Sequence, residues 1–151
     1  MDENLREKVR ALIREQGSCA LATASGNRPH CSLMAYATNP SCDEIYLMTL
    51  KDSRKYLNMR KNPAVSLLID NRQDTSPSDH IETIALTLSG RFRQIKEDTE
   101  RKHILGELSR KHPGLAYFFE NPAGEPVRII IESILLLEGP TKAHYDRIRE
   151  S

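Results

Sequence analysis

The sequence predicts a mainly β fold (α+β) of about six antiparallel strands closed into a small barrel with flanking helices. Three observations predict it. Runs of β-forming residues recur along the chain between short turns. The longest alternating run, residues 84–95, is interrupted by Gly90, where a bulge or bend helps a barrel turn a corner. The 151 residues suit one core, so we expect a single domain over 1–151.

Composition narrows the classes of function. The net charge is +1, and aromatic residues make up 5% of the chain, which argues against a nucleic-acid groove or an anionic membrane surface as partner. No apolar run approaches the ~18 residues that span a bilayer. The acidic start Met1–Asn4 has no hydrophobic signal segment, so we expect a cytoplasmic protein. The three cysteines have no CxxC spacing and predict neither a disulfide framework nor a metal site.

The first half of the chain reads as a helix followed by strands. Residues 1–17 predict an amphipathic helix, with Leu5, Val9, Leu12 and Ile13 on one face and Gly17 as its stop. Residues 19–25 and 30–38 predict a β-hairpin around a Gly-Asn turn. Short links then lead to strands over 45–49 and 65–70, which favours an antiparallel meander.

The second half alternates loops, strands and a helix. Residues 71–80 are polar and predict a loop, and residues 84–95 predict the bent strand. A helix is expected over 97–111 and a short apolar turn or helix over 115–119. Residues 127–137 are the most apolar strand, and the polar tail 139–151 predicts a short helix or an arm.

The segment between these halves carries the strongest functional signal. A helix is expected over 53–61, with Asp52 as its N-cap, yet Arg54 and Lys55 follow in the first turn. Cations there oppose the helix dipole, and a bound anion removes that conflict. First-turn N–H groups, the Ser53 hydroxyl and the Thr49 hydroxyl at the end of the preceding strand also suit a phosphate. The alternative is a solvated basic helix.

Several segments, in this order, resemble the pyridoxamine 5′-phosphate oxidase-like superfamily of FMN-binding split barrels. They are Leu21-Ala22-Thr23, Arg28-Pro29-His30-Cys31-Ser32, Ile45-Tyr46-Leu47-Met48-Thr49, Ser53-Arg54-Lys55, Asn62-Pro63-Ala64-Val65-Ser66-Leu67 and Leu88-Ser89-Gly90-Arg91. The resemblance covers residues 1–138. It implies a six-stranded split barrel that works as a homodimer with FMN at the interface.

The resemblance also implies site residues. Arg54 and Lys55 would hold the FMN phosphate with Ser53 and Thr49, next to Met48. The strand with His30, Cys31, Ser32 and Leu33 would run along the flavin ring. The oxidase has an Arg and a Lys where we align His30 and Ala35, and it has a Gln-Ser pair that this chain lacks after residue 95. We therefore expect an oxidoreductase acting on a small molecule, related to the oxidase but not the oxidase itself.

Other interpretations remain open. The same barrel could carry or sense haem or a deazaflavin without catalysis, in which case His30 or His144 matters more than Arg54. Alternation allows Cys31 to face the flavin, although core packing is favoured. His103 and His112 are expected in solvent. No Ser-His-Asp, HExxH, Walker or GxGxxG pattern occurs, so we assign no catalytic side chain.

Overall fold

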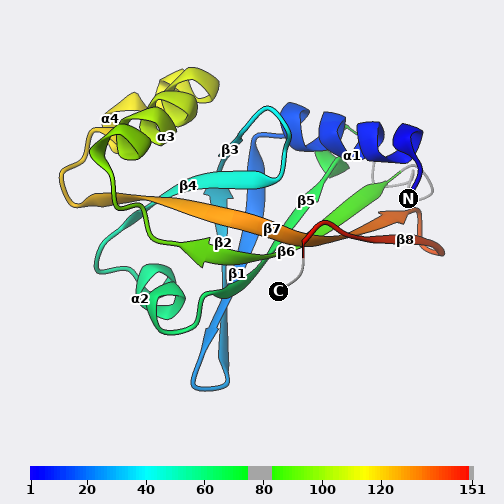
Figure 1. The fold of residues 1–151 in the computed structure, drawn as a ribbon, viewed down its shortest axis with the longest axis horizontal. Coiled ribbons are helices and arrows are strands. Elements are labelled where there is room, and N and C mark those ends of the chain that lie inside the picture. Colours follow the sequence, from blue (N-terminus) through cyan, green and yellow to red (C-terminus); the bar gives the residue numbers. More distant parts are fainter. Residues whose placement is uncertain (75–82, 150–151) are drawn as a thin grey trace.

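A computed structural model describes residues 1–74 and 83–149 (Figure 1). The helices are α1 (Glu3–Glu15), α2 (Arg54–Lys61), α3 (Asp98–Lys111) and α4 (Ala116–Phe119), with 3-10 turns η1 (Arg72–Asp74) and η3 (Pro113–Leu115). The strands are β1 (Ser18–Ser25), β2 (Arg28–Ala35), β3 (Ala37–Thr38), β4 (Glu44–Leu50), β5 (Ala64–Asp70), β6 (Ile84–Arg93), β7 (Gly124–Glu138) and β8 (Lys142–Arg147).

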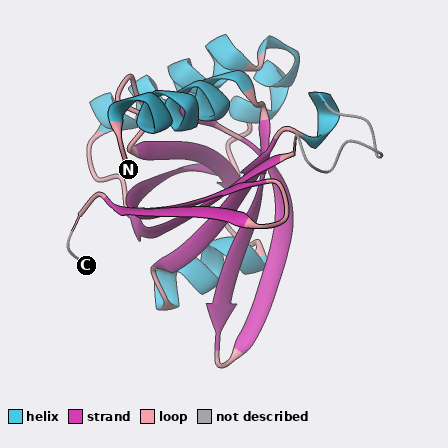
Figure 2. Ribbon diagram, turned by 90° about the vertical axis from the view of Figure 1, so that its right-hand side faces the viewer, coloured by secondary structure: helices cyan, strands magenta, loops and turns pink. Residues whose placement is uncertain are grey.

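All strands belong to one curled antiparallel sheet in the order β2-β1-β5-β6-β7-β4-β3, and β8 pairs with β7. β2 and β3 follow one another in the chain but lie at opposite ends of this order. The sheet therefore curls until its two ends meet, which is the expected mainly β barrel with flanking helices. Helices lie on both sides of the curled sheet (Figure 2).

Three expectations about the strands need correction. The described chain has eight strands rather than six, because two-residue β3 and the tail strand β8 add to the count. The tail is neither a helix nor an arm, since Lys142–Arg147 pairs with Ser133–Glu138. The expected meander of the first four strands is also wrong between β4 and β5, because β4 pairs with β7 and β5 pairs with β1. Chain order alone does not reveal these long-range pairings.

Local signals in the sequence explain the turns. Gly26 and Asn27 have φ values of 57° and 61°, the left-handed pair that a two-residue hairpin needs. The register of β6 with β7 shifts between Ser89 and Gly90, which confirms the expected bulge. A Cβ at position 90 would lie 2.6 Å from the carbonyl oxygen of Ile130, so only glycine fits there. The expected loop 71–80 begins at η1, and its part beyond residue 74 lies outside the described residues.

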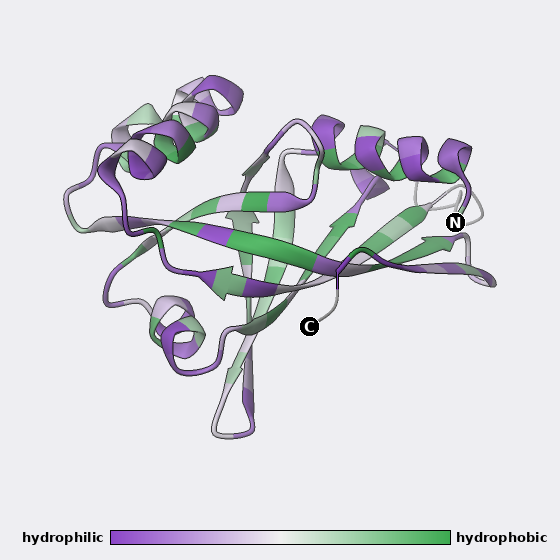
Figure 3. Ribbon diagram, in the orientation of Figure 1, coloured by the Kyte–Doolittle hydropathy of each residue, from purple (hydrophilic) through white to green (hydrophobic). Residues whose placement is uncertain are grey.

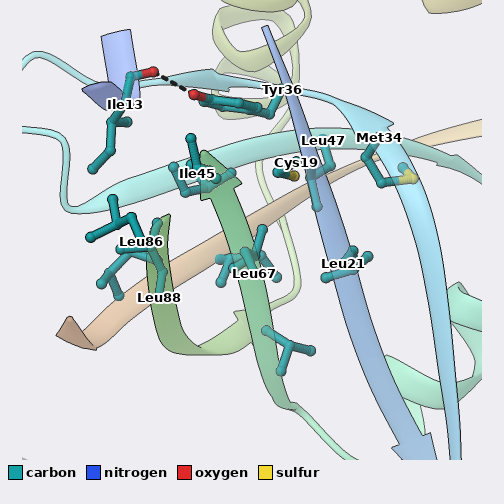
Figure 4. Packing of buried hydrophobic residues seen from close by; sticks show 14 of the residues in the cluster. Ile13, Cys19, Leu21, Met34, Tyr36, Ile45, Leu47, Leu67, Leu86 and Leu88 are labelled. Carbon is teal, nitrogen blue, oxygen red and sulfur yellow. Dashed lines mark hydrogen bonds between the residues drawn. The ribbon is translucent and has the colours of Figure 1, made fainter. Parts of the chain in front are cut away.

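Two apolar clusters fill the molecule. The larger lies inside the barrel and includes Val9, Leu12 and Ile13 of α1. Figure 3 shows that the face of this helix turned toward the sheet is hydrophobic. Tyr36, between β2 and β3, donates a hydrogen bond of 2.6 Å to the carbonyl oxygen of Ile13 and ties α1 to the barrel (Figure 4). The smaller cluster packs α3 and α4 against the outer face of β4. No helix of the described chain is long and apolar enough to cross a membrane.

Candidate functional site

A hollow of about 390 Å³ opens where the ends of β2 and β4 meet the start of α2 and the turn of η3 and α4. It is lined by Leu33, Met34, Ala35, Met48, Thr49, Leu50, Ser53, Lys55, Leu115, Phe118 and Phe119. Its volume lies in the range of small-molecule sites. Five residues that the sequence predicts for the site line this hollow, and they come from three different elements: Leu33, Met48, Thr49, Ser53 and Lys55.

The head of α2 forms one wall of the hollow. Its N-cap is Ser53 rather than the expected Asp52: the Ser53 hydroxyl accepts from the backbone N–H of Tyr56 at 3.4 Å. The chain reaches this cap through a tight turn in which the N–H of Ser53 donates to the carbonyl oxygen of Leu50 at 3.0 Å. The first turn of α2 contains no acidic residue. The conflict between the helix dipole and its cations is therefore present in the structure.

The two cations of this first turn have different surroundings. Lys55 is half-buried and lines the hollow, whereas Arg54 is exposed and is not among the lining residues. Neither side chain makes an ion pair or hydrogen bond within the described residues. Both charges remain available to an anion at the head of α2.

The other face of α2 fixes the helix on the barrel. Met59 is fully buried, and Tyr56 packs edge-to-face on Phe92 with ring centroids 6.1 Å apart. Asn58 is buried and donates its side-chain N–H to Thr23 Oγ1 at 3.1 Å. Asn62 donates to the carbonyl oxygen of Ala24 at 3.1 Å. These contacts hold the start of the helix in a fixed place relative to β4.

Thr49 is the residue of the hollow whose hydrogen bonding is incomplete. Its side chain is 1% exposed, and within the described chain its Oγ1 has no hydrogen-bond partner. A buried hydroxyl without a partner costs about 1–3 kcal/mol. Because Thr49 also lines the hollow, an oxygen of a ligand bound there is the kind of partner that this hydroxyl lacks. Phosphate oxygens have this chemistry, so the residues present fit a phosphate group.

Strand β2 contributes less to the hollow than expected. Its register places Leu33 opposite Ala20 and Cys31 opposite Ala22, on the outer face of the sheet. Cys31 is exposed, so the favoured core packing of its thiol is wrong. His30 and Ser32 are half-buried on the opposite face and do not line the hollow. Of this predicted group, only Leu33 reaches the hollow, and its side chain is 74% exposed.

An aromatic wall of the hollow was not predicted from the sequence. Leu115, Phe118 and Phe119 line the hollow from η3 and α4, a segment that the sequence predicts as a short apolar turn or helix without placing it at the site. Met48 lies between this wall and β7, and it packs over a glycine: a Cβ at position 124 would lie 1.7 Å from the Met48 Cε atom. The Phe-Phe pair directly before a loop was the available signal.

The histidines lie away from the hollow. His103 is exposed as expected and meets the Tyr46 ring edge-on at 6.2 Å. His112 is not in solvent: its Nε2 lies 2.7 Å from the carbonyl oxygen of Tyr36. His144 lies on β8, 3.1 Å from Glu138. Within residues 1–74 and 83–149, no group of three or more His, Cys, Asp or Glu side chains could hold a metal ion.

A family model described as pyridoxamine 5′-phosphate oxidase matches residues 5–133 of the chain. The chain belongs to this family. A pyridoxamine 5′-phosphate oxidase homolog of Schizosaccharomyces pombe is 41% identical over 69 residues, which cover 38% of this chain and 36% of that relative. The chain thus matches about a third of the relative's length.

Solved structures show the same fold. A haem-binding protein of Mycobacterium smegmatis superposes with a TM-score of 0.83 at 15% identity, over 97% of this chain and 59% of that one. An FAD-binding protein of Mesorhizobium loti gives 0.69 at 18% identity, over 90% and 94% of the two chains. Ala35 lines the hollow without a charge.

Proposed function

We propose that this member of the oxidase family is an FMN-binding flavoprotein and an oxidoreductase acting on a small molecule, distinct from the oxidase itself. One observation carries the proposal. The head of α2, with unpaired cations and no acid in its first turn, meets the unpartnered hydroxyl of Thr49 at the wall of one hollow. We place the protein in the cytoplasm, where the free thiols of Cys19, Cys31 and Cys42 stay reduced.

The phosphate of FMN would lie against Ser53 and Lys55. The Ser53 hydroxyl accepts from a backbone N–H, so its own proton is free for a phosphate oxygen. Lys55 adds charge from the hollow, Arg54 adds a second charge in the same first turn, and Thr49 completes the set. First-turn N–H groups and the helix dipole support the same negative charge.

The rest of the hollow suits a flat ring. Phe118, Phe119 and Leu115 form an apolar wall that excludes water, and Leu33 lies across from it on β2. When bound, FMN supplies hydride transfer, while the protein binds and orients the reactants. Such a reaction requires no acid or base from the protein. Lys55 is the one titratable side chain among the described residues that line the hollow.

The test is FMN titration of the full chain. We expect flavin absorbance to stay with the protein after desalting, flavin fluorescence to change on binding, and the melting temperature to rise with FMN concentration. Protein that remains colourless and gains no thermal stability with FMN would overturn the proposal. A Soret band in place of flavin bands would instead favour the haem-carrier alternative, with His30 as the nearest candidate ligand on β2.

We also propose that the partner is a second copy of the chain. One row of directly paired residues crosses the outer face of the sheet and contains no charge: Leu33, Ala20, Leu68, Thr87, Leu135 and Tyr145. Leu33, Leu68 and Tyr145 are 74%, 38% and 57% exposed. An uncharged patch of this kind can pair with its own copy across a two-fold axis. Leu33 belongs to both the row and the hollow, so the two copies would meet beside the flavin.

Sedimentation of a charged variant tests this dimer. Leu68→Glu puts a carboxylate in the middle of the row, and we expect the protein to sediment as a monomer. Leu57→Glu is the matched control, because Leu57 is also exposed but lies on the outer side of α2. A parent protein that is already a monomer would contradict the proposal, as would a dimer that survives Leu68→Glu.

A further inference from the structure

A second hollow lies directly beside the first. This groove, of about 520 Å³, runs between α3 and the loop that joins α4 to β7. Met48 and Phe119 line both spaces, so they form the wall that separates them. The proposed FMN site does not use the groove.

The turn before α2 forms the ridge between the two spaces. Leu50 and Ser53 line the first hollow, and Lys51, between them in the chain, lines the groove. The backbone N–H of Lys51 donates to the carbonyl oxygen of Ala123 at 3.0 Å, which fixes the position of this residue. The groove therefore begins next to the place proposed for the flavin phosphate.

The charges at the groove are unequal. Arg101 is held at 2.7 Å by Glu125, a carboxylate that is 8% exposed, so its charge is already balanced. Lys51 is exposed and makes no ion pair within the described residues. Lys51 is thus an unbalanced cation at the end of the groove nearest to Ser53. The exposed carboxylate of Glu120 also lines the groove and has no ion pair within the described residues.

The walls of the groove are apolar and open. Leu105, Phe119, Pro122 and Pro126 supply flat or aliphatic surface. Gly106 lies in the middle of α3, where glycine destabilises a helix relative to alanine. A Cβ at this position would meet nothing within 4 Å, so packing does not require glycine there. The missing side chain keeps the groove free for a ligand.

We propose that the groove holds the nucleotide half of a flavin dinucleotide, so that the chain binds FAD more tightly than FMN. This inference rests on the proposed flavin site. The FMN half occupies the first hollow, the second phosphate passes over the turn at Lys51, and the base lies against the apolar wall beside Gly106. The apolar wall suits a base, and the exposed cation Lys51 next to Ser53 suits the second phosphate.

Paired titrations of the full chain with FMN and FAD test the inference. We expect FAD to bind at least about tenfold more tightly than FMN. Gly106→Trp fills the groove from a position with free space, and we expect it to remove this preference while FMN affinity stays within about twofold. Gly106→Ala is the matched control, because it adds only a methyl group and should keep the preference for FAD.

A variant that removes the charge of Lys51 tests the inference independently of Gly106. Lys51→Ala should weaken FAD binding by roughly tenfold and leave FMN binding nearly unchanged, since only the second phosphate meets Lys51. Lys142→Ala, on exposed β8, removes the same charge far along the chain and should change neither affinity.

The outcomes separate this inference from the proposed function. If neither flavin binds, the flavin site itself is wrong. If FMN binds and FAD binds no more tightly, or if Gly106→Trp leaves the preference for FAD intact, the flavin site stands and the groove is not its extension. The same holds if Gly106→Trp weakens NADH binding to the FMN-loaded protein without affecting FAD, because the adenylate then belongs to a different dinucleotide.

Discussion

Helices α1 and α2 are both basic, but they use their cations in opposite ways. On α1, Arg6 and Lys8 pair with Asp146 and Glu138 of the C-terminal strands, and Arg10 and Arg14 pair with Glu7. On α2, the described residues provide no ion pair for any of the basic side chains, which are Arg54, Lys55, Arg60 and Lys61.

The caps of the two helices differ in the same sense. α1 begins with Asp2, which accepts from the N–H of Leu5 at 2.8 Å, and Glu3 adds a second negative charge to its first turn. α2 begins with a neutral serine and two cations. The charges of α1 thus serve the fold, because acids of α1 itself and of β7 and β8 balance them. The charges of α2 are left for something outside the chain, and a phosphate is the simplest group that fits.

The largest expected effect comes from removing the charges at the head of α2. Arg54→Ala together with Lys55→Ala should weaken FMN binding by about a hundredfold, because two contacts to a charged phosphate are lost. Arg60→Ala together with Lys61→Ala is the matched control, since it removes the same charge from the last turn of the same helix. Equal losses in the two double variants would show only a general attraction and would contradict a phosphate site.

Lys111 differs from the cations of α2, because its ammonium group is buried and has no ion pair within the described residues. Its Nζ has no hydrogen-bond partner in the described chain and lies 4.0 Å from the centroid of the Tyr36 ring. Burial lowers the pKa of Lys111 from 10.5 to about 8, while the nearby thiols of Cys19 and Cys42 oppose this shift. An unpaired charge costs little on exposed α2 but destabilises the native state here.

We therefore expect Lys111→Met to increase the free energy of unfolding at pH 7 by roughly 2 kcal/mol. In the parent protein, the unfolded chain keeps this proton up to about pH 10.5 and the native state loses it near pH 8. The parent should gain stability relative to the variant across that window, so the difference in urea unfolding should shrink as pH rises. Lys142→Met, at an exposed site, should show no such trend. A pH-independent difference for Lys111→Met would contradict a buried charge.

The sequence predicted elements better than it predicted their partners. The helices at residues 3–15 and 98–111, the Gly26-Asn27 turn and the bulge at Gly90 follow from local chemistry, and the structure confirms them. The pairing of β4 with β7 joins segments about eighty residues apart, and no local pattern encodes it. β8 was missed for the same reason: its residues are mostly polar, and only their pairing with β7 makes the segment a strand.

The candidate site shows the same limit. Thr49, Ser53 and Lys55 are close in sequence, so motif and helix-dipole arguments found them together, and all three line the hollow. Phe118 and Phe119 reach the hollow from α4, and their short apolar segment has no periodicity that could place it there. Alternation alone let Cys31 face either side, and the favoured core packing was wrong. The register of β2 with β1 is what places its thiol on the exposed face.

A smaller effect is expected at the hydroxyl that the fold leaves unsatisfied. Thr49→Val should stabilise the protein without ligand by about 1 kcal/mol, because it removes a buried hydroxyl that has no partner. The same change should weaken FMN binding severalfold. Thr23→Val is the matched control: Thr23 is equally buried, but its Oγ1 accepts from Asn58 at 3.1 Å. That variant should lose stability, and a loss in both variants would contradict the special position of Thr49.

The smallest effect should come from the balanced charges of α1. Asp146→Asn removes the partner of Arg6, with which it makes a contact of 3.1 Å near the surface, and should cost only about 0.5 kcal/mol. In ~1 M salt the cost should vanish, because charges at this distance are then screened. A double-mutant cycle with Arg6→Ala, measured by urea unfolding at low and high salt, isolates the interaction energy of the pair.

FMN affinity should not change in any of these variants, since α1 balances its charges within the chain. A change there equal to that at Arg54 and Lys55 would show that the flavin senses the net charge of the protein rather than a phosphate site at the head of α2.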